Sequence, residues 1–309
     1  MVRVLGFLVG LGFVGVAAWS LLWGAIAFLG EEHVESAEHK FHLEPKSLAQ
    51  ASDGPFGKYD RRQLQRGFQV YKEVCASCHG LSFVALRSME ELGYGEEEVK
   101  AIAAGFNVPD IDPKTGEWTM RKALPADRFP DPYPNEVAAR AGNNNALPPD
   151  LSLITKSRKG GAAYIYSLLT GYRDAATYRN EEGDALPADN RPGKGLHFNP
   201  YFANLNIAMP PPITTEGQVS YADGTKPTPD QMAKDVSAFL TWTAEPRLEN
   251  RHRTGLATLI FLIIATILAY MAYQNVWHGS SRRVRATAPL DPVNITKRDA
   301  ASREAGIEG

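Results

Sequence analysis

Two long stretches of this 309-residue chain carry no charged side chain. One of them, residues 255–273, is about 28 Å long as an α-helix, close to the roughly 30 Å thickness of a bilayer core. Because it is apolar all round, it predicts a transmembrane helix over residues 251–276. The other, residues 4–29, predicts either a secretory signal or a second membrane helix within residues 1–30. Ala25-Ile26-Ala27 is typical of a cleavage site, and both outcomes stay open.

Basic residues set the expected orientation of the chain. Arg282, Arg283 and Arg285 follow the second apolar run, and arginines beside a membrane helix favour the cytoplasmic side. We therefore expect residues 277–309 to form a cytoplasmic tail. Residues 31–250 are then one domain on the opposite side, which in a bacterium is the periplasmic face of the inner membrane.

Helical periodicity is clear in three segments of that domain. Residues 61–75 repeat apolar side chains at intervals of three and four. Residues 228–246 do the same: they begin with a capping box, Thr228 to Gln231, that has proline at the first helical position, and Pro246 closes the segment. Residues 161–170 predict a third, shorter helix, and most of the rest is rich in turn residues. The side chains expected to face the core are Leu64, Phe68, Tyr71 and Val74 or Cys75 in the first helix, and Met232, Val236, Phe239 and Leu240 in the second.

Charge adds one constraint on partners. The whole chain has a formal charge of -2, whereas residues 31–250 hold 31 acidic and 24 basic side chains, a net charge of -7. An acidic surface speeds the encounter with basic proteins, and it does not predict binding to nucleic acid. The alternative is that these charges only keep the domain soluble.

The two cysteines of the chain lie in one short motif, Cys75-Ala76-Ser77-Cys78-His79. This spacing is typical of covalent c-type haem attachment, in which both thiols bind the macrocycle and the histidine ligates the iron. The alternatives are a redox-active thiol pair, half of a zinc site or a structural disulfide. The first should lie in a βαβ pattern and the second needs further thiolates, which the chain lacks.

The second axial ligand of the iron is expected among the methionines. Met209 lies before three consecutive prolines, which fix the backbone and lower the entropy lost when a weak thioether ligand is held on iron. His197 is the next candidate. A His/Met pair generally gives a higher reduction potential than two histidines, which suits an electron acceptor late in a respiratory chain.

Several segments beyond the haem motif resemble one family, cytochrome c1, the haem c subunit of the cytochrome bc1 complex (quinol:cytochrome c oxidoreductase). The resemblance runs from about residue 57 to residue 277. It is carried by residues 66–71, 138–152, 167–172, 198–202, 208–211 and 235–246, together with the haem motif. The long segment 4–29 differs, because family members often carry a removable presequence there.

The resemblance implies a mainly α, c-type cytochrome fold with long loops around one covalent haem c, plus the C-terminal transmembrane helix. It implies that Cys75 and Cys78 bind the haem, that His79 and Met209 ligate the iron and that Arg140 lies near a haem propionate. Three further residues are expected to pack on the porphyrin, namely Pro148, Pro149 and Leu151.

The implied function is a one-electron relay from the Rieske iron-sulfur protein to a soluble or membrane-bound cytochrome c. Cytochrome b and membrane lipid are the other expected partners. Quinol chemistry would belong to the cytochrome b subunit, so that catalysis describes the complex and not this chain alone. The motif and the anchor by themselves equally permit a membrane-anchored monohaem cytochrome that serves another oxidase or dehydrogenase, and a haem sensor or peroxidase is a further alternative.

Overall fold

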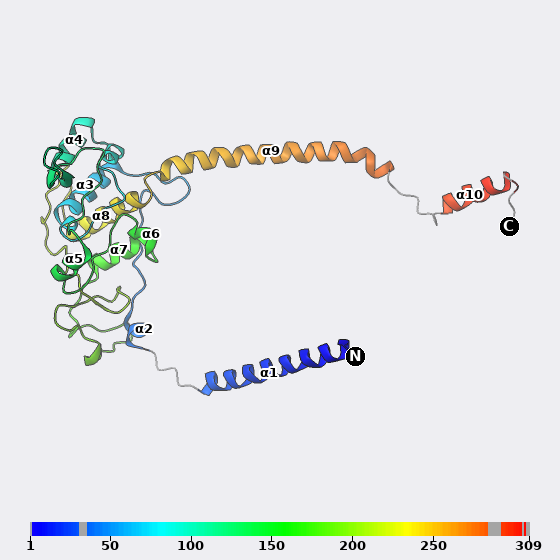
Figure 1. The fold of residues 1–309 in the computed structure, drawn as a ribbon, viewed down its shortest axis with the longest axis horizontal. Coiled ribbons are helices and arrows are strands. Elements are labelled where there is room, and N and C mark those ends of the chain that lie inside the picture. Colours follow the sequence, from blue (N-terminus) through cyan, green and yellow to red (C-terminus); the bar gives the residue numbers. More distant parts are fainter. Residues whose placement is uncertain (1, 31–35, 284–291, 305, 307–309) are drawn as a thin grey trace. The chain divides into compact units, whose positions relative to one another are not determined.

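The computed structural model describes residues 2–30, 36–283, 292–304 and 306. Arg285, and the side chains of Arg282 and Arg283, lie outside the described part of the chain. Helices dominate and the strands are few and short (Figure 1). The α-helices are α1 (Val2–Gly30), α2 (Ala37–Phe41), α3 (Arg61–Glu73), α4 (Glu96–Ala104), α5 (Glu136–Gly142), α6 (Ile154–Ser157), α7 (Gly161–Thr170), α8 (Pro229–Ala244), α9 (Leu248–Arg283) and α10 (Pro292–Glu304). The 3-10 helices are η1 (Cys75–Ser77), η2 (Leu86–Leu92) and η3 (Ala188–Asn190).

The chain forms two compact units. The first comprises Met1–Ala49 with Arg61–Ala244, and the second comprises Gln50–Asp60 with Glu245–Gly309. Within the second unit, the backbone N–H of Tyr59 donates to Glu249 and its hydroxyl donates to the carbonyl oxygen of Glu245. These bonds tie the segment 50–60 to the start of α9.

Helices α1 and α9 are the two candidate membrane spans among the described residues, over Val2–Gly30 and Leu248–His278. Their large apolar side chains are exposed, including Phe13, Trp19, Phe261 and Ile264. An exposed apolar surface of this length is stable in a bilayer and costly in water. Each span contains one of the two uncharged runs of the sequence, and the second span begins before and ends after the predicted helix 251–276.

The core of the first unit forms where α3 packs against α8, with α7 beside α8 (Figure 1). The predicted inward positions Leu64, Phe68 and Tyr71 are buried, as are Met232, Val236, Phe239 and Leu240. The Phe239 ring lies 5.7 Å from the rings of both Phe68 and Tyr71. The predicted helices at 161–170 and 228–246 are thereby confirmed, and the hydroxyl of Thr228 caps α8 by accepting from the N–H of Gln231.

Helix α3 differs from its prediction at its C-terminal end. The α-helix ends at Glu73, and Cys75–Ser77 form the 3-10 helix η1 instead of a last α-turn. Helix ends often tighten in this way because their last carbonyl groups lack i+4 partners. The change moves the first cysteine off the helix and onto a turn.

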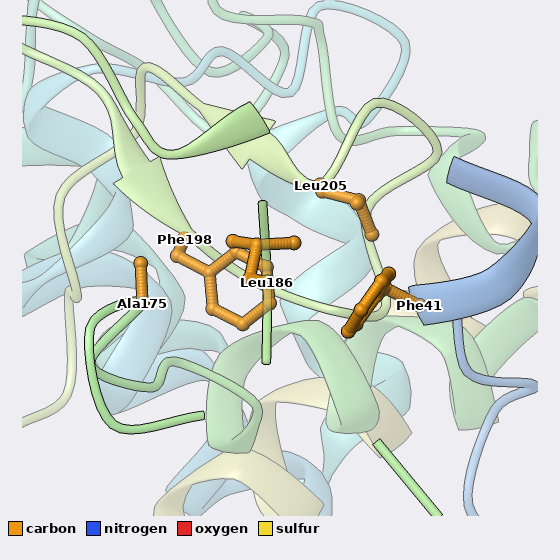
Figure 2. Packing of buried hydrophobic residues seen from close by; sticks show 5 residues of the cluster. All are labelled: Phe41, Ala175, Leu186, Phe198 and Leu205. Carbon is orange, nitrogen blue, oxygen red and sulfur yellow. The ribbon is translucent and has the colours of Figure 1, made fainter. Parts of the chain in front are cut away.

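The turn-rich regions contain two antiparallel hairpins that the sequence pattern did not predict. Strand β1 (Asn107–Ile111) pairs with β2 (Trp118–Lys122), and the two-residue strands β3 (His197–Phe198) and β4 (Asn206–Ile207) pair with each other. The second hairpin leads directly to Met209. Its packing is provided by a separate cluster of buried side chains, which is shown in Figure 2: Phe41, Ala175, Leu186, Phe198 and Leu205.

Candidate functional site

The predicted haem-binding motif forms one tight turn after α3. The N–H groups of Cys78 and His79 both donate to the carbonyl oxygen of Cys75, at 3.1 and 2.9 Å. Both cysteines are unpaired thiols. Although Cys75 is half-buried as a residue, its thiol is enclosed, and this desolvation raises the pKa of Cys75 to about 12. A redox-active pair needs a thiol with a lowered pKa, so the redox alternative is disfavoured.

The imidazole of His79 is oriented by a backbone carbonyl. Its Nδ1 lies 2.7 Å from the carbonyl oxygen of Pro149. Because that oxygen can only accept, Nδ1 carries the proton and the lone pair of Nε2 is left for a metal. Desolvation lowers the pKa of His79 despite the hydrogen bond to Pro149, which favours the neutral ring that ligates iron.

A ladder of hydrogen bonds joins the loop that contains Pro149 to the segment that follows His79. The N–H of Leu151 donates to the carbonyl oxygen of Gly80 at 2.9 Å. One carboxylate oxygen of Asp150 accepts from the N–H of Ser82 at 2.8 Å, and it shares the single proton of the Ser82 hydroxyl, 2.8 Å away, with Asp131 at 2.7 Å. Pro149 therefore cannot move relative to His79 without breaking this ladder. Desolvation opposes ionisation of Asp150, but the hydrogen bonds from Ser82 and Ser152 outweigh it and lower the pKa of the carboxyl.

We expect Asp150→Asn to lower the free energy of unfolding by about 1–3 kcal/mol at neutral pH, because one carboxylate oxygen accepts from Ser82 and the other from the N–H of Ser152, whereas an amide has only one acceptor oxygen. The pKa of Asp150 is lower in the folded than in the unfolded chain, so its contribution is complete above the unfolded pKa of about 3.9. It is lost as the pH falls through the folded pKa. Thermal unfolding of the haem-loaded full chain in detergent, followed by haem absorbance from neutral to acid pH, measures the difference.

The exposed Asp189 provides the matched control, because Asp189→Asn removes the same charge from the surface. It should melt as the wild type does. An Asp150→Asn protein with wild-type stability at neutral pH, or with a deficit that does not shrink in acid, would contradict the proposed ladder.

Tyr71 connects α3 to the haem turn. Its hydroxyl donates to the carbonyl oxygen of His79 at 3.0 Å, and its ring is buried in the core. The sequence indicated Tyr71 only as a core position, since helical periodicity says which face is buried and nothing about a hydroxyl. The sequence likewise placed Asp150 within the segment 138–152 and indicated no role for its side chain.

Met209 lies just beyond the β3–β4 hairpin. It is half-buried, and its carbonyl oxygen accepts a 3.0 Å hydrogen bond from the hydroxyl of Tyr172. His197, the other candidate for the sixth ligand, pairs with Ile207 in the same hairpin, and its ring lies 6.5 Å from that of Tyr172. Both candidates are thus held by one hairpin and one tyrosine. The choice of Met209 stays a prediction.

Arg140 lies on α5 and is exposed. Its Nη1 donates to the carbonyl oxygen of Asn145 at 3.2 Å, the one hydrogen bond that its guanidinium makes within the described residues. Asn144 and Asn145 adopt left-handed backbone conformations, with φ of 51° and 63°, which asparagine tolerates better than most residues. The remaining N–H groups of Arg140 are available to a carboxylate such as a haem propionate.

These observations fit a haem. Two thiols lie on one turn, a neutral imidazole presents its free nitrogen, and Leu151 is buried while Pro148 is half-buried and Pro149 exposed in the loop that orients that imidazole. The zinc alternative finds no support, since the described residues contain no group of three or more His, Cys, Asp or Glu side chains that could hold a metal ion.

Comparison with known proteins gives a consistent result. A family model described as "Cytochrome C1 family" matches residues 50–280. The chain is 44% identical over 272 residues to "Cytochrome c1-2, heme protein, mitochondrial" of Solanum tuberosum, which covers 88% of this chain and 99% of that protein. It is 42% identical over 236 residues to the cytochrome c1 of Rhodospirillum rubrum, with 72% and 84% covered. It is also 44% identical over 239 residues to "Cytochrome b/c1" of Bradyrhizobium diazoefficiens, covering 74% of this chain but only 34% of that protein.

Proposed function

This chain belongs to the cytochrome c1 family, the electron-transferring haem subunit of the cytochrome bc1 complex, and from that premise we propose that it holds one haem c bound covalently through Cys75 and Cys78. The observation that carries the proposal is the turn on which both thiols and His79 lie together, with Nδ1 of His79 engaged by Pro149. The bound haem supplies a reversible one-electron couple.

The residues of the chain define and tune that couple. His79 provides the proximal nitrogen, held in one orientation by Pro149. Met209 would ligate the iron as well, and its thioether would favour ferrous iron and raise the potential. Arg140 compensates the charge of a propionate. No residue of the chain is assigned a proton transfer or a substrate.

The proposed route brings one electron from a Rieske iron-sulfur protein and passes it to a cytochrome c. The name of the Bradyrhizobium relative, cytochrome b/c1, supports cytochrome b as a neighbour in the complex. Quinol oxidation then belongs to the complex as a whole. Helix α9, and α1 where it is retained, hold the subunit in the bacterial inner membrane, with the haem domain in the periplasm and the C-terminus in the cytoplasm.

The experiment that tests this function is capture of the complex from gently solubilised membranes through a C-terminal tag on this chain. We expect the reduced-minus-oxidised spectrum to show b-type and c-type haem together, and a Rieske protein to co-purify. A c-type signal alone, with oxidase or dehydrogenase subunits or with no partner, would overturn the bc1 assignment in favour of an anchored monohaem cytochrome.

We expect electron transfer to a basic cytochrome c to slow with salt. Residues 31–250 carry a net charge of -7, and at low ionic strength this attraction speeds encounter. Raising the ionic strength from about 10 to 150 mM shortens the screening length from roughly 30 to 8 Å, and the second-order rate constant should fall by about tenfold. Stopped-flow oxidation of the reduced complex measures it. Acetylation of the surface lysines of the acceptor should abolish the dependence of this rate constant on salt. If the rate constant with the untreated acceptor does not change with salt, the proposed electrostatic docking is wrong.

A further inference from the structure

A short N-terminal segment packs against the hairpin that leads to Met209. This strap, residues 36–46, contains α2 and begins where the hydroxyl of Ser36 accepts from the N–H of His39. Its residue Phe41 is only 3% exposed and belongs to the buried cluster of Figure 2. There the ring faces Leu186 and Leu205, and it lies 6.4 Å from the ring of Tyr178.

Hydrogen bonds hold the strap beyond Phe41. The N–H of Leu43 donates to the carbonyl oxygen of Pro200 at 2.8 Å. The N–H of Lys46 donates to the Ser167 hydroxyl at 2.8 Å, and its ammonium donates to the Thr170 hydroxyl at 2.7 Å. The strap is therefore fixed both to α7 and to the segment between β3 and β4.

The cluster supports a strained point of the hairpin. Leu205 has a φ of 62°, a left-handed conformation that is unfavourable for a leucine, yet its side chain is 1% exposed. Its carbonyl oxygen accepts from the N–H of Asn199, which closes the turn between the strands. Such a conformation persists only when the surroundings hold it, and Phe41 contributes part of the apolar pocket that does so. From Leu205 the chain runs through β4 to Met209.

We propose that the strap, through Phe41, is a positioning element for the second axial ligand, an inference that rests on the proposed ligation of the haem iron by Met209. The thioether is a weak ligand, so the fraction of time that it occupies the iron depends on how firmly its loop is held. When the pocket around Leu205 loses Phe41, the hairpin gains freedom and Met209 leaves the iron more often. The sixth position then becomes open to external ligands.

The test compares variants of the full chain in the assembled complex. Carbon monoxide binds ferrous haem only when the sixth position is open, so its apparent binding constant reports the open fraction. We expect Phe41→Ala to keep covalent haem, to weaken the methionine-to-iron charge-transfer band and to bind carbon monoxide about tenfold more readily than wild type. Phe41→Leu, which keeps most of the apolar volume, should lie between the two. Glu44→Gln, at an exposed position of the strap, should behave as wild type.

Met209→Leu, made in the otherwise wild-type full chain, separates the assignment of Met209 as a ligand from the positioning role of the strap. If that variant keeps the charge-transfer band and still excludes carbon monoxide, the ligand assignment itself is wrong. If it opens the iron while Phe41→Ala behaves as wild type, the ligand stands and the strap is overturned. Should Phe41→Ala lose its haem by misfolding, Phe41→Leu decides. A Phe41→Leu protein with wild-type carbon monoxide binding then overturns the proposal, and an increase supports it.

Discussion

Met209→Leu is expected to leave haem covalently attached through Cys75 and Cys78 but to lower its reduction potential by roughly 120 mV. Removing the thioether removes a ligand that favours ferrous iron. For a one-electron couple, each factor of ten in that preference corresponds to about 59 mV, so this shift is about a hundredfold. Electron transfer from the Rieske centre to this haem would then be about 120 mV less favourable, and turnover of the complex should stop. Redox titration of the purified complex, followed at the c-type absorbance, measures the potential.

The chain offers two controls for this prediction. Met120 lies on β2 and is 62% exposed, so Met120→Leu should leave the potential unchanged. His197→Gln tests the other candidate on the same hairpin. If Met209→Leu keeps the wild-type potential while His197→Gln shifts it, the histidine is the ligand and the proposed His/Met pair is wrong.

Gly67→Ala is expected to destabilise the first unit by roughly 3 kcal/mol or more and to reduce haem incorporation. A Cβ at this position would lie 2.1 Å from the carbonyl oxygen of Asp235 and 2.6 Å from the Cβ of Phe239. Both atoms belong to α8, and rotation of a side chain moves neither a backbone carbonyl oxygen nor a Cβ. Helices α3 and α8 must therefore move apart. Helix α3 ends at Glu73, two residues before Cys75, so a displacement of α3 also moves Cys75.

The sign of this effect is diagnostic, since alanine stabilises a helix by about 1 kcal/mol relative to glycine where packing does not intervene. Thermal melting and haem staining of the purified chain measure stability and incorporation. Gly193→Ala is the matched control, because nothing lies within 4 Å of the Cβ that it would add. A Gly67→Ala protein that melts at or above the wild-type temperature would contradict the close approach of α3 and α8.

Local sequence patterns predicted the principal helices of the first unit correctly. Apolar side chains repeat at helical spacing along residues 61–73, 161–170 and 229–244, because one face of each helix is buried against a neighbour. Capping residues mark the start of such a helix within a few positions. The β1–β2 hairpin was not predicted, because each strand has only five residues and the apolar side chains of β2 do not face the core. Trp118 and Met120 are exposed, and an ion pair between Arg121 and Asp110 holds the other face. The short apolar-polar alternation of residues 118–121 therefore does not mark a buried face.

The sequence by itself determined the chemistry of the site, because the two thiols and the imidazole are neighbours in the chain and their spacing alone fits a haem. Only the tertiary structure decided how those groups are oriented. Which nitrogen of His79 is free depends on Pro149, 70 residues away, and the hydrogen bond from Ser82 to Asp150 spans 68 residues. The proposed support of the Met209 loop by Phe41 joins residues that are more than twice as far apart in the sequence. Such contacts leave no local pattern, because they depend on where folding brings distant segments together.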